Sequence, residues 1–170
     1  MLFDPGSVVA VLLQSGIDVN FDFNPVANVL QGAVSSFLTT LIVGAILVAV
    51  APEFTEDRMA AVLDDPVGSF VYGFLVLLFL LLAAFVLAIT VVGILVALPL
   101  LLLGYVVWAV GSAVAFLAIA DRFVGRDDGW TKPVVVAAAM NGGLVLTGIG
   151  SVLAFCIGAA GFGAVLEDRL

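Results

Sequence analysis

Histidine is absent from the 170 residues, and cysteine occurs once, as Cys156. Metal clusters and disulfide frameworks need several of these side chains, so neither is available to this sequence. Cys156 lies in an apolar run, where a thiol is most simply a small buried side chain. We therefore expect no metal site, no cofactor and no disulfide.

Charged residues are also scarce. The chain has 5 Lys and Arg and 13 Asp and Glu, with 11% charged residues, 64% hydrophobic residues and a mean hydropathy of +1.35. Soluble proteins have roughly 45–50% apolar and about 25% charged residues. Residues 66–120 contain no charge, and residues 129–166 contain only Lys132. Such long runs without charge predict an integral membrane protein surrounded by a lipid bilayer.

The charges that are present are mainly acidic, and the formal net charge is −8. This excess argues against nucleic acid as a partner, because phosphate binding requires clustered Lys and Arg. The carboxylates lie in loops or tails, so no buried acid is available for proton transfer, and we expect no catalytic residue and no enzyme. Acidic loops poor in lysine suit concentrated salt, which weakens repulsion between like charges, so we expect a salt-loving source.

The apolar runs predict an all-α membrane protein with three to four membrane segments. Residues 26–51 form the first, which as a helix would be about 39 Å long, enough for a hydrocarbon core of about 30 Å. Residues 66–120 are long enough for two spans. Residues 134–166 are too many for one upright span and too few for two complete spans.

Two shorter helices are expected outside these spans. One, at residues 8–15, is too short to cross the bilayer and is expected to lie in the interface. The other is an amphipathic surface helix within residues 53–65, expected to begin at Thr55. The domain organisation is then an interfacial segment at 1–25, one membrane domain at 26–166 and a tail at 167–170.

A Leu-x-x-Thr-x-x-Gly frame occurs twice, at Leu87, Thr90 and Gly93 and again at Leu144, Thr147 and Gly150. The repeat extends over about 85–104 and 142–161. Glycine lowers helix propensity by about 1 kcal/mol relative to alanine. A threonine hydroxyl can donate a hydrogen bond to a carbonyl freed by a break, which is needed where no water is present. We therefore predict helix breaks at both frames.

The second break would give a re-entrant hairpin with a short limb at about 134–146. A single kinked helix over 134–166 is the alternative. With two hairpins, all five basic residues fall on one side of the membrane. The bias of basic residues toward the cytoplasm then places the N-terminus outside and the basic loops in the cytoplasm of a multi-pass cell-membrane protein.

Four stretches carry a resemblance to a known family. They read Pro52-Glu-Phe-Thr-Glu-Asp-Arg-Met, Asp65-Pro-Val-Gly-Ser-Phe-Val-Tyr-Gly-Phe, Ile89-Thr-Val-Val-Gly-Ile and Gly158-Ala-Ala-Gly-Phe-Gly-Ala164. Over about 43–166 the sequence resembles the polytopic membrane domain that accompanies bactofilin-like, polymer-forming proteins in prokaryotes, in a haloarchaeal-type version without the β-helical domain. Leu95 departs from the family pattern, which has proline there. The resemblance implies membrane anchoring or organisation, with no catalytic residues.

Uncharged polar residues form a stripe along the first span, at Asn24, Asn28, Gln31, Ser35 and Thr39. Their spacing puts them on one helix face. They could line a water-filled path, or they could hydrogen-bond to another helix, and we favour the second interpretation. A seam of small residues lies beside the stripe, at Gly32, Ser36, Thr40 and Gly44. Such a seam permits close packing against a helix of this chain or of a second copy.

These patterns favour a structural function. We expect a membrane anchor or scaffold that self-associates as a homo-oligomer and presents acidic cytoplasmic loops to a partner protein. The alternative is a homo-oligomeric channel or facilitator for a small solute or ion, lined by the polar stripe.

Overall fold

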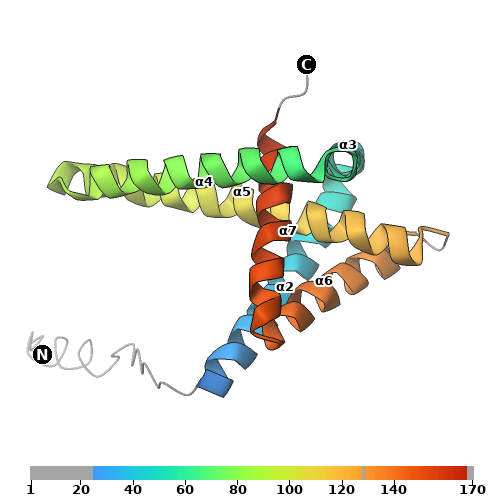
Figure 1. Ribbon diagram of the computed structural model, residues 1–170. Coiled ribbons are helices and arrows are strands. Elements are labelled where there is room, and N and C mark those ends of the chain that lie inside the picture. The colour runs from blue at the N-terminus through green and yellow to red at the C-terminus, as the bar shows by residue number, and fades with distance from the viewer. Residues whose placement is uncertain (1–24, 128, 168–170) are drawn as a thin grey trace, which may run out of the picture.

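The computed structural model describes residues 25–127 and 129–167 of the chain. Within this part it contains only helices: α2 (Pro25–Val50), α3 (Pro52–Asp64), α4 (Pro66–Ala88), α5 (Val91–Val124), α6 (Thr131–Leu146) and α7 (Ile149–Leu166) (Figure 1). The predicted all-α class is confirmed. Among the described helices, α2, α4, α5 and α7 are long and apolar enough to cross a membrane, and α6 is apolar but shorter. The predicted interfacial helix at 8–15 lies outside the described residues.

Prolines and an aspartate define the start of α3 and α4. Pro52 and Pro66 occupy the first turn of each helix, where the missing backbone N–H would have had no helical partner. The Asp65 carboxylate accepts a hydrogen bond from the Gly68 backbone N at 2.9 Å and so caps α4. Thr55 does not begin α3 as predicted. It is buried within the first turns of that helix and donates to the Ala51 carbonyl at 2.8 Å.

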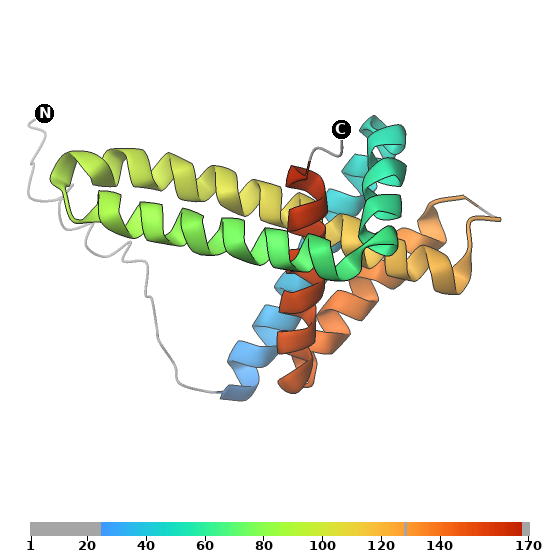
Figure 2. The same cartoon turned by 45° about the horizontal axis from the view of Figure 1, so that its top comes forward.

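The helix α5 changes its surroundings along its length. Its first half lies beside α4, and together they project away from the remaining helices (Figures 1 and 2). We call the outer part of this hairpin, residues 74–106, the arm. The second half is covered by the other helices, and residues 113–118 are all fully buried. The helix continues past the predicted end at residue 120 until Gly125, whose φ of 67° ends it.

The other helices pack around this buried half of α5. The helix α7 crosses both α4 and α5, while α2 lies along α6 (Figure 1). The chain leaves helical geometry at Gly148, whose φ is 68°, so α6 and α7 are two helices.

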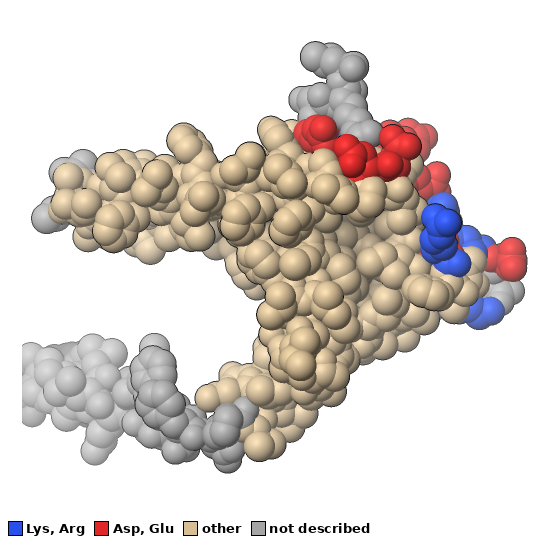
Figure 3. All heavy atoms as spheres, in the orientation of Figure 1, with Lys and Arg blue, Asp and Glu red and all other residues tan. Residues whose placement is uncertain are grey.

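Charge is segregated on the surface. Charged residues gather at one end of the molecule, away from the tip of the arm and from the lower end of α7 (Figure 3). We call this end the charged face. Among the described residues it comprises Glu53, Glu56, Asp57, Arg58, Asp64, Asp65, Asp121, Arg122, Arg126, Asp127, Lys132 and Glu167. The ends of α2, α5 and α7 and the starts of α4 and α6 therefore meet there.

Candidate functional site

The two repeated frames form the same hydrogen bonds. The Thr90 hydroxyl donates to the Leu87 carbonyl at 3.1 Å and accepts from the Gly93 backbone N at 2.9 Å. At the second frame, the Thr147 hydroxyl donates to the Leu144 carbonyl at 2.8 Å and accepts from the Gly150 backbone N at 3.1 Å. Each threonine thus accepts from one N–H in the first turn of the following helix, and it donates to a leucine carbonyl that also accepts from the threonine's own backbone N.

Glycine is required at the end of each frame. A Cβ on Gly93 or Gly150 would overlap the leucine carbonyl oxygen and the threonine hydroxyl of its own frame. The backbone paths differ, because Thr90 is extended whereas the second turn uses Gly148 with a φ of 68°. Each frame therefore closes a hairpin between two helices. The polar atoms of each frame form hydrogen bonds with one another.

The small-residue seam of α2 packs mainly against α6. A Cβ on Gly142 of α6 would lie 3.0 Å from the Ala33 carbonyl oxygen and 3.0 Å from Phe37 Cβ, so these two helices approach closely. In the middle of the seam, Asn141 Nδ2 donates to Thr40 Oγ1 at 2.7 Å, and both side chains are buried. The seam thus has its partner within this chain.

The glycines near the end of α7 serve the same purpose. A Cβ on Gly161 would overlap the Gly111 carbonyl of α5, and a Cβ on Gly163 would overlap the Ser69 carbonyl of α4. Contacts between backbones at this distance exclude any side chain. These close contacts lie between helices of one chain.

The polar stripe has a different environment from the seam. Asn24 lies outside the described residues. Asn28, Gln31 and Ser35 are exposed, and Thr39 is half-buried. The stripe is therefore not covered by another helix of the chain over most of its length.

The inner end of the stripe contributes to a cavity of about 210 Å³, which we call the polar recess. It is walled by α2, α5 and α6 through Ser35, Ser36, Thr39, Thr40, Ser112 and Asn141. The aromatic rings of Tyr105 and Trp108 also line the polar recess. The Trp108 ring packs against Phe155, with 5.3 Å between ring centroids. None of the residues lining the polar recess is charged.

The polar recess opens toward the outer surface between α2 and α5. Toward the charged face it ends at apolar contacts, since the Cβ position of Gly44 is 3.6 Å from Leu117 Cδ1 and 3.7 Å from Val134 Cγ1. On the outer side it adjoins a groove of about 590 Å³ between α2 and α5, which includes Leu38 and Val106. This groove faces the apolar exterior of the molecule. The polar recess is therefore a side pocket rather than a path through the chain.

The charged face is fixed to the helices beneath it. Met59 and Val62 of α3 are buried, and Arg58 donates to the Ala164 carbonyl at 3.2 Å and the Glu167 carbonyl at 2.8 Å. A cation at the end of a helix also interacts favourably with the helix dipole, which strengthens this link to α7. The surface helix is thus anchored to the membrane helices.

A second cluster joins α3 to the α5–α6 connection. Arg126 forms ion pairs with Glu56 at 2.6 Å and with Asp121 at 2.9 Å. Its guanidinium also lies 4.4 Å from the centre of the Trp130 ring.

Comparison with known proteins places the chain in a family. Residues 6–170 match the model of a family described as "Domain of unknown function (DUF8173)". The chain belongs to this family. No curated protein and no solved structure matches it. The resemblance to bactofilin-associated membrane domains stays a prediction.

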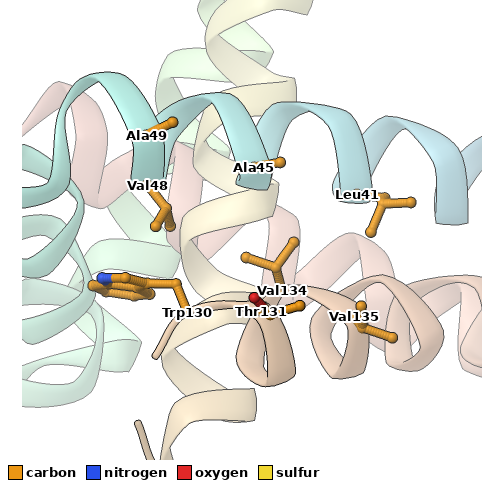
Figure 4. Close-up of a pocket in the computed structure, with 8 residues that line it drawn as sticks. All are labelled: Leu41, Ala45, Val48, Ala49, Trp130, Thr131, Val134 and Val135. Atoms are coloured by element: carbon orange, nitrogen blue, oxygen red, sulfur yellow. The ribbon is translucent and has the colours of Figure 1, made fainter. Parts of the chain in front are cut away.

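A further cavity of this DUF8173 chain lies next to the charged face. It is a groove of about 310 Å³ between α2 and α6, with Trp130 at one end and Ala45 and Val48 above it (Figure 4). Its lining is almost entirely apolar, so it lacks the convergent polar groups of the polar recess. Among the described residues there is no group of three or more His, Cys, Asp or Glu side chains that could hold a metal ion.

Sequence reasoning singled out four of the six small polar residues that line the polar recess in this DUF8173 chain. Ser35 and Thr39 belong to the predicted stripe, and Ser36 and Thr40 to the predicted seam. Ser112 and Asn141 were missed because they come from two other apolar runs. The available signal was that each is an uncharged polar residue in the middle of a long apolar run.

Proposed function

We propose that this protein is a membrane-embedded scaffold whose charged face binds a protein partner. The observation that carries the proposal is the segregation of charge, because the described charged residues share one face and the rest of the described surface carries no charge. An apolar exterior suits anchoring in lipid. An immobilised, mainly acidic face suits recognition of a partner with basic side chains.

The chemistry of the charged face supports this function. The helix α3 exposes Glu53, Glu56 and Asp57, while Arg58 attaches its inner side to α7. Exposed carboxylates on a fixed helix lose little freedom on binding, which lowers the entropic cost of association. The partner is therefore expected to present a basic patch to α3.

The proposed membrane topology follows from the same face. Both hairpins start and finish at the charged face, and their turns lie at the uncharged ends. We place this face in the cytoplasm, with the hairpins entering the bilayer from that side and the N-terminal end of α2 outside. Self-association of the scaffold would use apolar surface exposed on the membrane helices.

Site-specific photo-crosslinking in native membranes tests the proposal. A photoreactive amino acid at Asp57 is expected to give a discrete protein adduct, and the same group at Phe79 on the arm serves as the control position. Charge reversal by Glu53→Lys with Glu56→Lys should abolish the Asp57 adduct without lowering protein abundance. An Asp57 adduct that survives the reversal, or no adduct at all, would contradict the proposed partner site.

A homo-oligomeric channel or facilitator remains the second candidate, supported by the exposure of Gln31 and Ser35 on the outer surface of α2. Because the polar recess is closed toward the charged face, such a path would have to lie between copies. Single cysteines at Gln31, Ser35 and Thr39 in a Cys156→Ala background would test it. Labelling of Ser35→Cys and Thr39→Cys by a membrane-impermeant thiol reagent would favour the channel, and protection of both would favour the scaffold.

A further inference from the structure

The polar recess presents hydrogen-bonding groups to an apolar exterior. It lies near the middle of α2, with Thr39 and Ser35 roughly 17–23 Å from the end of that helix at the charged face, given a rise of about 1.5 Å per residue. Polar groups at this depth have no bulk water to satisfy them and are costly unless they find partners. Among the described residues, the side-chain hydrogen bond within the lining joins Asn141 to Thr40. The hydroxyls of Ser35, Ser36 and Ser112 therefore remain available to a ligand.

The lining also restricts the chemistry of that ligand. No charged side chain lines the polar recess, so an ionised headgroup would lose its hydration without gaining a counter-charge. Hydroxyl groups donate and accept hydrogen bonds, which suits neutral carbonyl, ether or hydroxyl oxygens. Tyr105 and Trp108 add flat apolar surface for a ring or a chain.

The adjoining groove provides a route of entry and a place for an apolar tail. The groove and the polar recess share Ser35, Thr39, Tyr105 and Ala109, so they form one continuous hollow. The groove is lined mainly by aliphatic side chains and faces the apolar exterior. A molecule dissolved in the bilayer could thus place its polar head in the polar recess while its tail stays in the groove.

We propose that the polar recess binds a lipid-soluble molecule with a neutral, oxygen-bearing head, drawn from the bilayer through the groove between α2 and α5. A quinone and an uncharged glyceride share this chemistry. The proposal is independent of the partner site on α3, because the polar recess is separated from the charged face by Leu117 and Val134.

Tryptophan fluorescence provides the test, since the chain contains 2 Trp residues and Trp108 lines the polar recess. In the full-length Trp130→Phe protein, reconstituted in nanodiscs, decylubiquinone is the quenching probe. Quenching of Trp108 is expected to saturate. In the Ser35→Leu variant, which fills the mouth of the hollow, the apparent affinity should fall about tenfold or more. Ala27→Leu adds the same side chain at an exposed site on α2 and should leave quenching unchanged.

Competition identifies the ligand class. Relief of quenching by dioctanoylglycerol would support neutral oxygen-bearing heads in general, and saturable quenching that dioctanoylglycerol leaves unchanged would assign the site to quinone-type heads. Equal relief by decanoate would overturn the requirement for a neutral head. Quenching that is linear and indifferent to Ser35→Leu would overturn the site. Disulfide formation between Ser35→Cys copies in a Cys156→Ala background would also overturn it, because a second chain would then cover the polar recess.

Discussion

The α4–α5 and α6–α7 hairpins turn on the same threonine and glycine hydrogen bonds, but their limbs meet different surroundings. The arm is rich in leucine and phenylalanine, and it leaves Phe79 73% and Leu95 73% exposed within the chain. The α7 limb is rich in glycine and alanine, and Ala159 and Ala164 are fully buried. The two hairpins therefore share the hydrogen bonds of their turns but differ in packing, because the arm is exposed within the chain and α7 is buried.

The difference shows that side-chain size determines where each hairpin lies. In lipid there is little hydrophobic drive for helices to associate, so association depends on close packing. Gly161 and Gly163 let the α7 backbone reach α5 and α4, whereas the large side chains of the arm remain exposed within the chain. The repeated frame closes a hairpin, and the composition of its limbs decides whether they pack against other helices of the chain or stay exposed.

The largest expected effect on stability comes from adding a side chain where α7 of the α6–α7 hairpin packs most closely against α4. Gly163→Ala should destabilise the fold by about 3 kcal/mol or more, because the new methyl group would overlap the Ser69 backbone and force α7 away from α4. Unfolding in mixed SDS and detergent micelles, followed by circular dichroism, measures this cost. Gly143→Ala is the matched control in α6, where a Cβ meets nothing within 4 Å. Equal stability of the two variants would show that the α4–α7 contact is not as close as described.

Removing the hydrogen bonds that attach α3 to α7 should have the next largest effect on stability. Arg58→Met keeps the side-chain stem but removes the hydrogen bonds to the Ala164 and Glu167 carbonyls, with an expected cost of about 2 kcal/mol. Arg126→Met removes the more exposed ion pairs with Glu56 and Asp121 and should cost less than about 1 kcal/mol. The same unfolding assay ranks the variants. A reversed order would place the main anchor of α3 on the α5–α6 connection.

The difference in backbone conformation between the two turns predicts a smaller loss of stability when Gly148 is replaced. Gly148→Ala places a side chain at a φ of 68° and should cost about 1–2 kcal/mol through strain alone, since no atom lies within 4 Å of the new Cβ. At the first turn, Thr90 is extended and carries a side chain without such strain. Stability of Gly148→Ala equal to that of Gly143→Ala would mean that the second turn can adopt the path of the first.

Local features of the fold were predictable from sequence, and features shared among distant segments were not. The breaks at Thr90 and Thr147 depend on residues three positions apart, so the repeated frame indicated them. The polar recess needs Ser112 and Asn141 beside α2, and no spacing rule relates residues so far apart in the chain. Thr55 failed as a predicted helix start because Pro52, an equally good start signal, lies three residues earlier.

The smallest effect is expected on the outer face of the arm. Leu82 is 59% exposed within the chain, so Leu82→Ala removes contacts with lipid rather than with protein, and its cost should stay below about 0.5 kcal/mol. The buried counterpart Leu117→Ala should cost about 3 kcal/mol because it leaves a cavity. If Leu82→Ala proved as costly as Leu117→Ala, and its cost depended on protein concentration, the arm would be packed against a second copy. The contrast between the hairpins would then be one between contacts within a chain and contacts between chains, and the leucine-rich arm would be the surface through which copies of this chain associate.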